Sequence, residues 1–280
     1  MMIRVRDKLL NQFLREDAWD FVPRTFNRGP FETDIKKKHK ISICTTCMNR
    51  TSDLKQTYEQ NIKDNSDYPY VEFVLLNYNS YSDDMDKWVN NTLSKYIEKG
   101  VVNYYHTTEP EYYSMTHSRN IAFKVAQGDI VTNVDADHYT KKGFAEFLNL
   151  LANNQPRKAV FLKSKQKNRG RLGFYKKEFL WLGGYNEEIE GYGHDDVDLL
   201  NRALCSGFTA LFFGGEYCAI TKDHKRHPTN NYKNKDWRYT QRKNTLISLL
   251  NLKCKRFRAN QDRHWGKAKL LKNFTEEIEI

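Results

Sequence analysis

Short apolar runs alternate with amphipathic stretches through the first half of the chain. Four β-rich runs predict strands, at residues 41–46, 71–76, 101–105 and 130–134. Helical spacing of apolar residues predicts helices between them, near 54–64, 84–98 and 115–126, with Asp53 as the N-cap of the first. This alternation predicts an α/β fold with a mostly parallel central sheet flanked by helices on both faces.

The two ends of the chain differ from this alternating part. Residues 1–38 combine rough helical spacing with a stretch that contains Pro and Gly, which predicts an N-terminal helical appendage. We therefore expect three parts: this appendage, an α/β domain over 39–234, and a basic helical C-terminal extension over 235–280.

Composition narrows the class of protein. With 39% hydrophobic and 14% aromatic residues, the 280-residue chain can bury a substantial core. No apolar run is long enough to span a bilayer, and the first residues do not resemble a signal peptide, so we expect a cytoplasmic protein. Cys44 and Cys47 form a C-x-x-C, but no second Cys/His pair follows at a zinc-site spacing, and ordinary thiols are favoured.

The net charge of +11 is concentrated late in the chain. Residues 222–272 contain 16 Lys or Arg against three Asp. Such a segment attracts phosphates, anionic lipids, acidic glycans or nucleic acid, and charge alone does not choose among them. Apolar residues interleave its second half, so residues 253–272 are expected either to contact an anionic membrane or an acidic glycan, or to form a solvated helix packed on the domain.

Polar residues follow three of the predicted strands, where ligands bind in open α/β sheets. Asn49 and Arg50 follow the first strand, Asn77 the second, and the pair Asp135 and Asp137 the fourth. Two carboxylates at i and i+2 can converge on Mn²⁺ or Mg²⁺. The triplet is not specific by itself, because Asp84–Asp86 and Asp196–Asp198 repeat it; its position after a buried strand favours the metal role.

A glycine-rich acidic loop precedes a predicted helix near residue 195. Glycines allow a close approach to a ligand, and the nearby aromatic rings could stack on sugars: Trp181, Tyr185 and Tyr192. Asp195 and Asp196 begin the helix. They either stabilise its first turn or include a general base that takes a proton from an acceptor hydroxyl.

Two histidines follow the strand-like run 216–221. Either His224 or His227 could add an imidazole to the metal site, with His224 preferred, although a surface histidine among lysines is often only solvated.

Four ordered blocks together resemble the glycosyltransferase A fold, in particular the β-1,4-galactosyltransferase type and its bacterial relatives in glycosyltransferase family 2. The blocks lie within about 41–227: Asn49-Arg50, Ser118-Arg119-Asn120, Val134-Asp135-Ala136-Asp137, and the set from Gly183-Gly184-Tyr185-Asn186 through Gly191-Tyr192-Gly193-His194-Asp195-Asp196-Val197-Asp198 to Asn201-Arg202. The resemblance implies a metal-dependent, inverting transfer of a sugar from a nucleotide donor, with UDP expected, to a glycan or glycolipid acceptor.

The resemblance also implies residue roles on the donor side. Thr46, Asn49 and Arg50 would contact the nucleotide, with Asn77 near its base. Arg119 would belong to the helix behind the donor site. Asp137 would bind the metal, and Asp135 would bind it through water or reach the ribose.

On the acceptor side, Asp196 occupies the position of the family's catalytic base and Asp195 the neighbouring acidic position. Tyr192 and Gly193 would border the donor and acceptor sugars. The chain departs from the galactosyltransferases at Asp195, where they have Glu, and at Thr221, where their Met ligand would fall.

Two other functions remain as alternatives. A nucleotidyltransferase would need a glycine-rich phosphate loop after the first strand, where residues 47–52 contain no glycine. A non-catalytic binding relative is supported only by the basic segment, and no nucleic acid partner is expected.

Overall fold

The computed structural model describes residues 19–163, 170–221 and 229–280. Its helices are α2 (Thr51–Asp64), α3 (Met85–Glu98), α4 (Met115–Val125), α5 (Phe144–Asn154), α6 (Lys176–Trp181), α7 (Asp195–Cys205) and α8 (Trp237–Lys253), with a 3₁₀ turn at Gly215–Tyr217. Its strands are β1 (Phe26–Asn27), β2 (Ile41–Cys47), β3 (Val71–Tyr78), β4 (Val102–Thr107), β5 (Ile130–Asn133), β6 (His138–Tyr139), β7 (Ala159–Lys163), β8 (Leu172–Tyr175), β9 (Thr209–Phe213), β10 (Ala219–Ile220), β11 (Lys269–Lys272) and β12 (Glu276–Glu279).

One large sheet organises the described residues, in the strand order β1-β9-β7-β8-β5-β2-β3-β4-β11-β12. Strands β5, β2, β3 and β4 run parallel, as do β7, β9 and β1, while β8 runs antiparallel between β5 and β7. Cys47 pairs with Asn77 and Cys44 with Asn133, so the carboxyl ends of β2, β3 and β5 meet at one edge. The short strands β6 and β10 pair separately, just beyond that edge.

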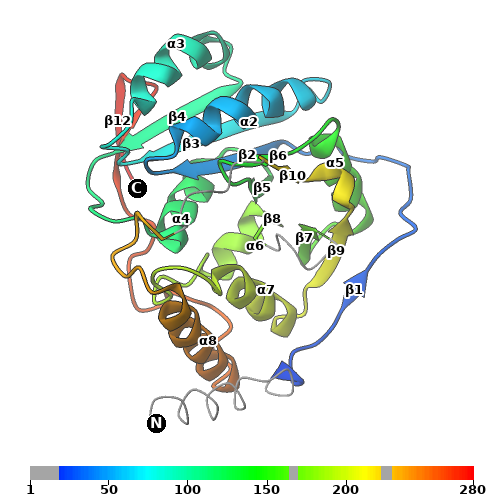
Figure 1. Cartoon of the computed structure of the whole chain (residues 1–280). Helices are drawn as coiled ribbons and strands as arrows, with labels where there is room; N and C mark the ends of the chain where they lie inside the picture. Colours follow the sequence, from blue (N-terminus) through cyan, green and yellow to red (C-terminus); the bar gives the residue numbers. More distant parts are fainter. Residues whose placement is uncertain (1–18, 164–169, 222–228) are drawn as a thin grey trace.

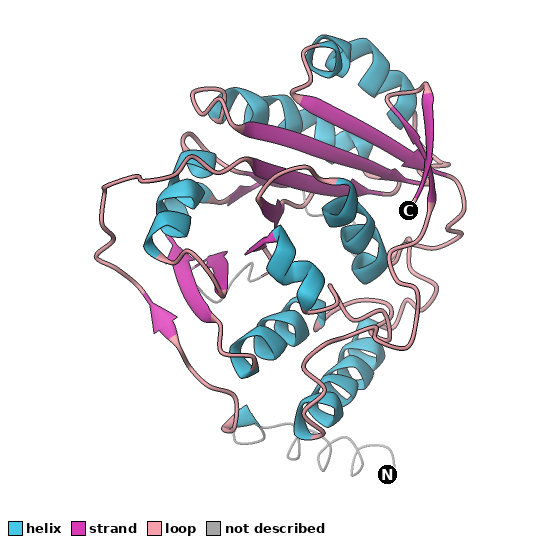
Figure 2. Ribbon diagram, turned by 180° about the vertical axis from the view of Figure 1, so that it is seen from behind, coloured by secondary structure: helices cyan, strands magenta, loops and turns pink. Residues whose placement is uncertain are grey.

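Helices cover both faces of the sheet, and each face has its own core. One core joins the apolar faces of α2, α3 and α5 to the sheet, including Leu54, Val89 and Leu148. The other joins those of α4, α6 and α7, including Phe123 and Phe179 (Figures 1 and 2). The predicted α/β class, with a mostly parallel sheet between helices, is confirmed.

The elements predicted between residues 41 and 134 agree closely with those observed, except at the start of α2. This helix begins at Thr51, so Asp53 lies in its first turn and the N-cap prediction was wrong. Asp83 instead accepts a hydrogen bond from the Thr51 backbone N–H at 2.8 Å. A carboxylate from a distant loop therefore satisfies one of the helix's free donors, which a local pattern does not reveal.

The two ends differ from the helical segments that the sequence suggested. After α8 the chain turns into β11 and β12, a hairpin whose strand β11 pairs antiparallel with β4, so the expected helix does not extend through 254–280. Within the N-terminal segment, residues 1–18 lie outside the described part, and 19–38 contain the short β1, which adds to the sheet beside β9. In the described part, no helix is long and apolar enough to cross a membrane.

Candidate active site

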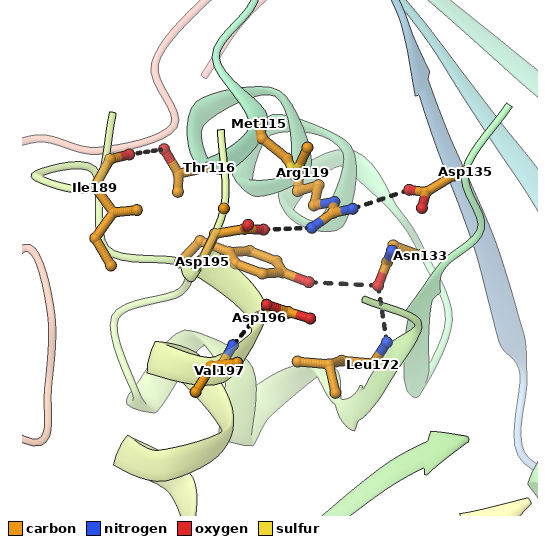
Figure 3. A network of polar contacts seen from close by, with 12 residues as sticks. Met115, Thr116, Arg119, Asn133, Asp135, Leu172, Ile189, Asp195, Asp196 and Val197 are labelled. Carbon is orange, nitrogen blue, oxygen red and sulfur yellow. Dashed lines mark hydrogen bonds and ion pairs between the residues drawn. The ribbon is translucent and has the colours of Figure 1, made fainter. Parts of the chain in front are cut away.

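Arg119 lies at the centre of the candidate site and links two acidic segments that are far apart in sequence. Its Nη2 donates to Asp135 Oδ1 at 2.9 Å, and its Nη1 donates to Asp195 Oδ2 at 2.5 Å. Helix α4 carries Arg119, the loop after β5 carries Asp135, and α7 begins with Asp195 (Figure 3). The strand-end carboxylates and the helix-start carboxylates therefore face one another across a single guanidinium.

Burial strengthens these charge interactions. Arg119 is only 4% exposed, and although burial disfavours its charge, Asp195 and Asp135 raise its pKa. The Asp135 side chain is 36% exposed; burial acts to raise its pKa, but Arg119 and His138 overcome this and lower the pKa to about 2. Asp135 therefore stays ionised, as a ligand for a cation or a ribose hydroxyl requires.

The second carboxylate of the strand-end loop, Asp137, has a different cation beside it. Arg50 Nη2 donates to Asp137 Oδ2 at 3.0 Å, and Arg50 Nε donates to Asp53 at 2.8 Å. Burial acts against the charge of Arg50, but Asp137 and Asp53 raise its pKa. Arg50 is thus held as a cation at the carboxyl end of β2, beside the acid pair.

His138 completes a set of groups that could hold a metal. Its Nε2 lies 3.8 Å from Asp137 Oδ1 and its Nδ1 lies 3.8 Å from Asp135 Oδ2. The ring is 7% exposed, Nδ1 has no hydrogen-bond partner among the described residues, and burial lowers the pKa of His138. A neutral imidazole between two carboxylates is a donor set that suits Mn²⁺.

The described residues do not form a finished metal cage. No three metal-ligating side chains among them converge closely enough on one point. The preferred ligand His224, together with His227, lies outside the described residues, so the expectation for it stays a prediction. The chemistry of Asp135, Asp137 and His138 fits a divalent cation that also takes oxygens from a substrate diphosphate.

Thr46 and Asn49 lie at the same sheet edge. The Thr46 hydroxyl is 2.7 Å from the hydroxyl of Tyr113 and accepts a hydrogen bond from Ser118. Asn49 has a positive φ of 55° and its amide donates to Asn231 Oδ1 at 3.3 Å. The loop after β2 is thus already bonded to the segment around residue 231, which comes from far along the chain.

Asn77, expected near the nucleotide base, is buried and bonded within the protein. It is 1% exposed; its amide donates to Asp86 and its carbonyl oxygen accepts from the Ser80 backbone. In this arrangement Asn77 shapes the loop after β3 and has no free group for a ligand.

The acidic loop carries the acceptor residues predicted from sequence. Asp195 is 5% exposed and Asp196 is partly exposed, with its Oδ1 accepting from the Val197 backbone at 2.8 Å. Gly193 has a φ of 94°, and the partly exposed ring of Tyr192 packs edge-on against Tyr232. Asp137, His138, Asp135, Arg119 and Asp195 form one chain of contacts that ends beside Asp196.

The other two aromatic residues proposed for sugar stacking do not present an open ring face at the site. Tyr185 is 0% exposed and packs against Phe123 and Phe179 in the core, so its ring cannot stack on a sugar. Trp181 is exposed, but its ring lies beside that of Phe208. Phe208 follows the C-terminal end of α7, which is opposite the end that carries Asp195. Aromatic character alone does not tell a core ring from a ligand-facing ring.

A further cation of this region, Arg171, is fully buried and donates to the carbonyl oxygens of Tyr217 and Tyr139. Burial lowers its pKa, while Asp135 and Asp137 act to raise it. Arg171 therefore contributes positive potential from behind the acid pair.

Sequence reasoning missed three residues of this region: His138, Tyr113 and Asn244. His138 directly follows the acid pair in sequence, which was a usable signal. Tyr113 and Asn244 come from a loop and from α8, and only the tertiary structure brings them to the site.

Comparison with known proteins places this geometry in a family. The sequence profile of Glycosyl transferase family 2 matches residues 42–214, and the chain belongs to this family. A search of curated protein sequences gave no match.

Solved structures with the same fold include glycosyltransferases that bind different donors. Mannosyltransferase PcManGT from Pyrobaculum calidifontis, in complex with GDP-Man and Mn²⁺, has a TM-score of 0.61 and 17% identity over 88% of this chain and 71% of that one. S. aureus TarS, in complex with UDP-GlcNAc, has a TM-score of 0.57 and 15% identity over 76% of this chain and 67% of that one. At these identities the likeness establishes the glycosyltransferase A fold.

Proposed function

We propose that this family 2 enzyme transfers a sugar from a nucleotide-diphosphate donor to an acceptor hydroxyl, with inversion at the anomeric carbon. One observation carries the proposal: Arg119 contacts Asp135 of the strand-end acid pair and Asp195 of the acidic helix. A donor held at the acid pair would then lie beside the carboxylates that receive the acceptor.

The donor side is proposed to use Asp137 and Asp135, with His138, to hold Mn²⁺ or Mg²⁺. When bound, such an ion offsets the charge that grows on the departing diphosphate. Arg50 adds a fixed cation at the same edge, where it contacts Asp137. Thr46 and Asn49 border the space proposed for the nucleotide.

The acceptor side is proposed to use Asp196 as general base. The acceptor oxygen attacks the anomeric carbon, its proton passes to Asp196, and the bond from that carbon to the diphosphate oxygen breaks in the same displacement. Asp195, held by Arg119, would accept a hydrogen bond from the acceptor, and Tyr192 with Gly193 would border the sugar.

UDP is our first choice of nucleotide, on the resemblance to β-1,4-galactosyltransferases. The structures that share the fold leave the alternative open, since PcManGT is described with GDP-Man and TarS with UDP-GlcNAc. A glycan or glycolipid is proposed as acceptor, with the enzyme in the cytoplasm and in contact with the inner membrane surface.

A panel of nucleotide sugars, each with Mn²⁺ and with chelator, tests the function. We expect hydrolysis or transfer with one nucleotide class, dependent on the metal. Release of inorganic pyrophosphate from a nucleoside triphosphate would indicate a nucleotidyltransferase instead. Metal-dependent binding without turnover of any donor would indicate a non-catalytic relative.

A further inference from the structure

A surface at the C-terminal ends of α7 and α8 combines apolar side chains with cations. We call it the basic face and define it by the apolar residues Phe21, Trp181, Leu250 and Phe257 and the cations Lys253, Lys255, Arg256 and Arg258. Phe21, Trp181 and Leu250 are 37%, 46% and 56% exposed. Leu250 lies one helical turn before Lys253, on the same side of α8.

The cations of the basic face are exposed, and within the described ranges no carboxylate forms an ion pair with them. Two of them instead lie over the aromatic rings. Lys253 Nζ is 4.2 Å from the Phe21 ring centroid, and Arg258 Cζ is 5.6 Å from that of Trp181. Arg258 is fixed there by donating to the Trp181 carbonyl oxygen at 2.8 Å. Positive charge and exposed rings therefore occupy the same surface.

A groove of about 370 Å³ opens on the basic face. Its walls include Phe21, Pro23, Leu252 and Phe257, and the end of α7 contributes Cys205. This apolar groove is rimmed by Lys253 and Lys255. Such an arrangement suits a lipid interface, since the groove can contact acyl chains while the lysines contact anionic headgroups.

We propose that the basic face binds the surface of an anionic phospholipid bilayer. The cations match the charge of the headgroups, and the exposed aromatic rings suit the interfacial layer. The exposed Leu250 favours a lipid surface over an acidic glycan. A bilayer offers hydrocarbon in which the leucine side chain can be buried, whereas a polysaccharide does not.

The position of the basic face gives the membrane contact a role in delivering the acceptor. This role rests on the proposed function. Helix α7 runs from Asp195 at the candidate site to Cys205 at the groove, and it packs beside α8 (Figure 1). Its 11 residues span roughly 16 Å at about 1.5 Å per residue. A membrane-bound acceptor would then reach the acidic loop from the bilayer side.

Cosedimentation with vesicles tests the binding itself, whatever reaction the enzyme catalyses. The whole chain is mixed with vesicles of phosphatidylcholine alone or with added phosphatidylglycerol. We expect binding only to the anionic vesicles, a loss of at least roughly tenfold in Lys255→Glu/Arg256→Glu, and a loss of about threefold in Leu250→Ser. Lys63→Glu and Lys99→Glu, exposed on the α2 and α3 side of the sheet, serve as charge controls and should bind as the unchanged protein does.

Three outcomes would overturn the proposal: no binding to anionic vesicles, equal losses in the control variants, or unchanged binding of Leu250→Ser. In the last case, binding to heparin in parallel would assign the basic face to an acidic glycan. If Lys255→Glu/Arg256→Glu loses vesicle binding but still turns over a soluble donor and acceptor fully, the result supports the membrane contact. The proposed function is then unaffected. Failure of turnover with intact vesicle binding would count against the function alone.

Discussion

The side-chain amide of Asn244 donates a hydrogen bond to the carbonyl oxygen of Gly193, at 2.9 Å, two residues before Asp195. The same amide donates to the Glu190 carbonyl oxygen at 2.9 Å, and Asn244 is 0% exposed. Helix α8, which lies outside the residues matched by the family profile, thereby holds both ends of the acidic loop.

The loop needs such support because its backbone conformation is unfavourable. His194 has a φ of 73°, a left-handed value that is costly for a residue with a side chain. A side chain at Gly191 would displace α8 or Thr240, since an added Cβ would lie 2.7 Å from Thr240 Cγ2. Contacts from α8 therefore fix the direction in which Asp195 and Asp196 leave the loop.

Replacing Asn244 by Ala should lower kcat for transfer by about tenfold, because the acidic loop loses the two hydrogen bonds from Asn244 while Asp195 and Asp196 remain. Losing these two hydrogen bonds to partly buried carbonyl oxygens should also cost about 1–3 kcal/mol of stability. Nucleotide binding, measured by calorimetry, should change little. Asn251→Ala is the matched control, since Asn251 on the same helix bonds only the exposed Glu188. Equal losses in both variants would contradict a specific role for Asn244.

Replacing Asp196 by Asn should reduce turnover by at least roughly a hundredfold, because the amide cannot take the acceptor proton. The substitution keeps the shape of the side chain, and its Oδ1 can still accept from the Val197 backbone. Nucleotide affinity should therefore stay within about twofold of the unchanged protein. Turnover that survives the change would remove Asp196 from the role of base.

Replacing Asp137 by Asn should abolish the effect of Mn²⁺ on nucleotide binding, since the variant loses a charged ligand of the proposed cation site. Arg50 also loses its partner at 3.0 Å, so some affinity for the nucleotide alone could be gained. Asp84→Asn, in another Asp-x-Asp triplet and exposed, is the control. Titrations with and without Mn²⁺ measure the difference; an unchanged metal effect in Asp137→Asn would be inconsistent with the site.

The strands and the loops after them could be predicted from sequence because their signals are local. The run 130–134 is β-rich and apolar, so Asp135 and Asp137 were correctly placed beyond a strand end. The ion pairs of Arg119 could not be predicted, because they join residues 76 and 16 positions apart. The hairpin at 269–279 was missed for a similar reason, since β11 is stabilised by pairing with β4, which lies more than a hundred residues earlier.

The Asp196–Asp198 triplet contains one aspartate that we propose as the general base and another that forms a buried ion pair. Asp198 is 0% exposed and accepts from Arg202 Nε at 2.7 Å, while Arg202 also donates to the carbonyl oxygens of Leu182 and Gly184. Arg202→Met should lower stability by about 3–5 kcal/mol, because it leaves a buried charge unpaired. The double variant Arg202→Met/Asp198→Asn should recover part of this in chemical denaturation. No recovery would mean that the carbonyl contacts, rather than the ion pair, carry the effect.

The last prediction concerns pH, and it follows from the burial of Asp195. Burial raises the pKa of Asp195 to about 6. The Arg119 guanidinium, which also contacts Asp135, acts to lower this pKa but does not offset the effect of burial. The ordinary pKa of an aspartate is near ~4, so between about 4 and 6 the folded protein holds a proton that the unfolded chain has lost. By linkage, this group's contribution to stability then falls as pH rises through that window, by up to about 3 kcal/mol.

Asp195→Asn isolates this contribution, since the amide does not titrate. The unfolding free energy of the unchanged protein, relative to the variant, should decline from pH 4 to pH 6 and level off above it. Because an ionised Asp195 is the form that accepts a hydrogen bond from the acceptor, kcat/KM of the unchanged protein should rise over the same range. Denaturation and initial rates measured at half-unit steps give both curves. A stability difference that stays constant from pH 4 to pH 7 would show that Arg119 keeps Asp195 ionised throughout.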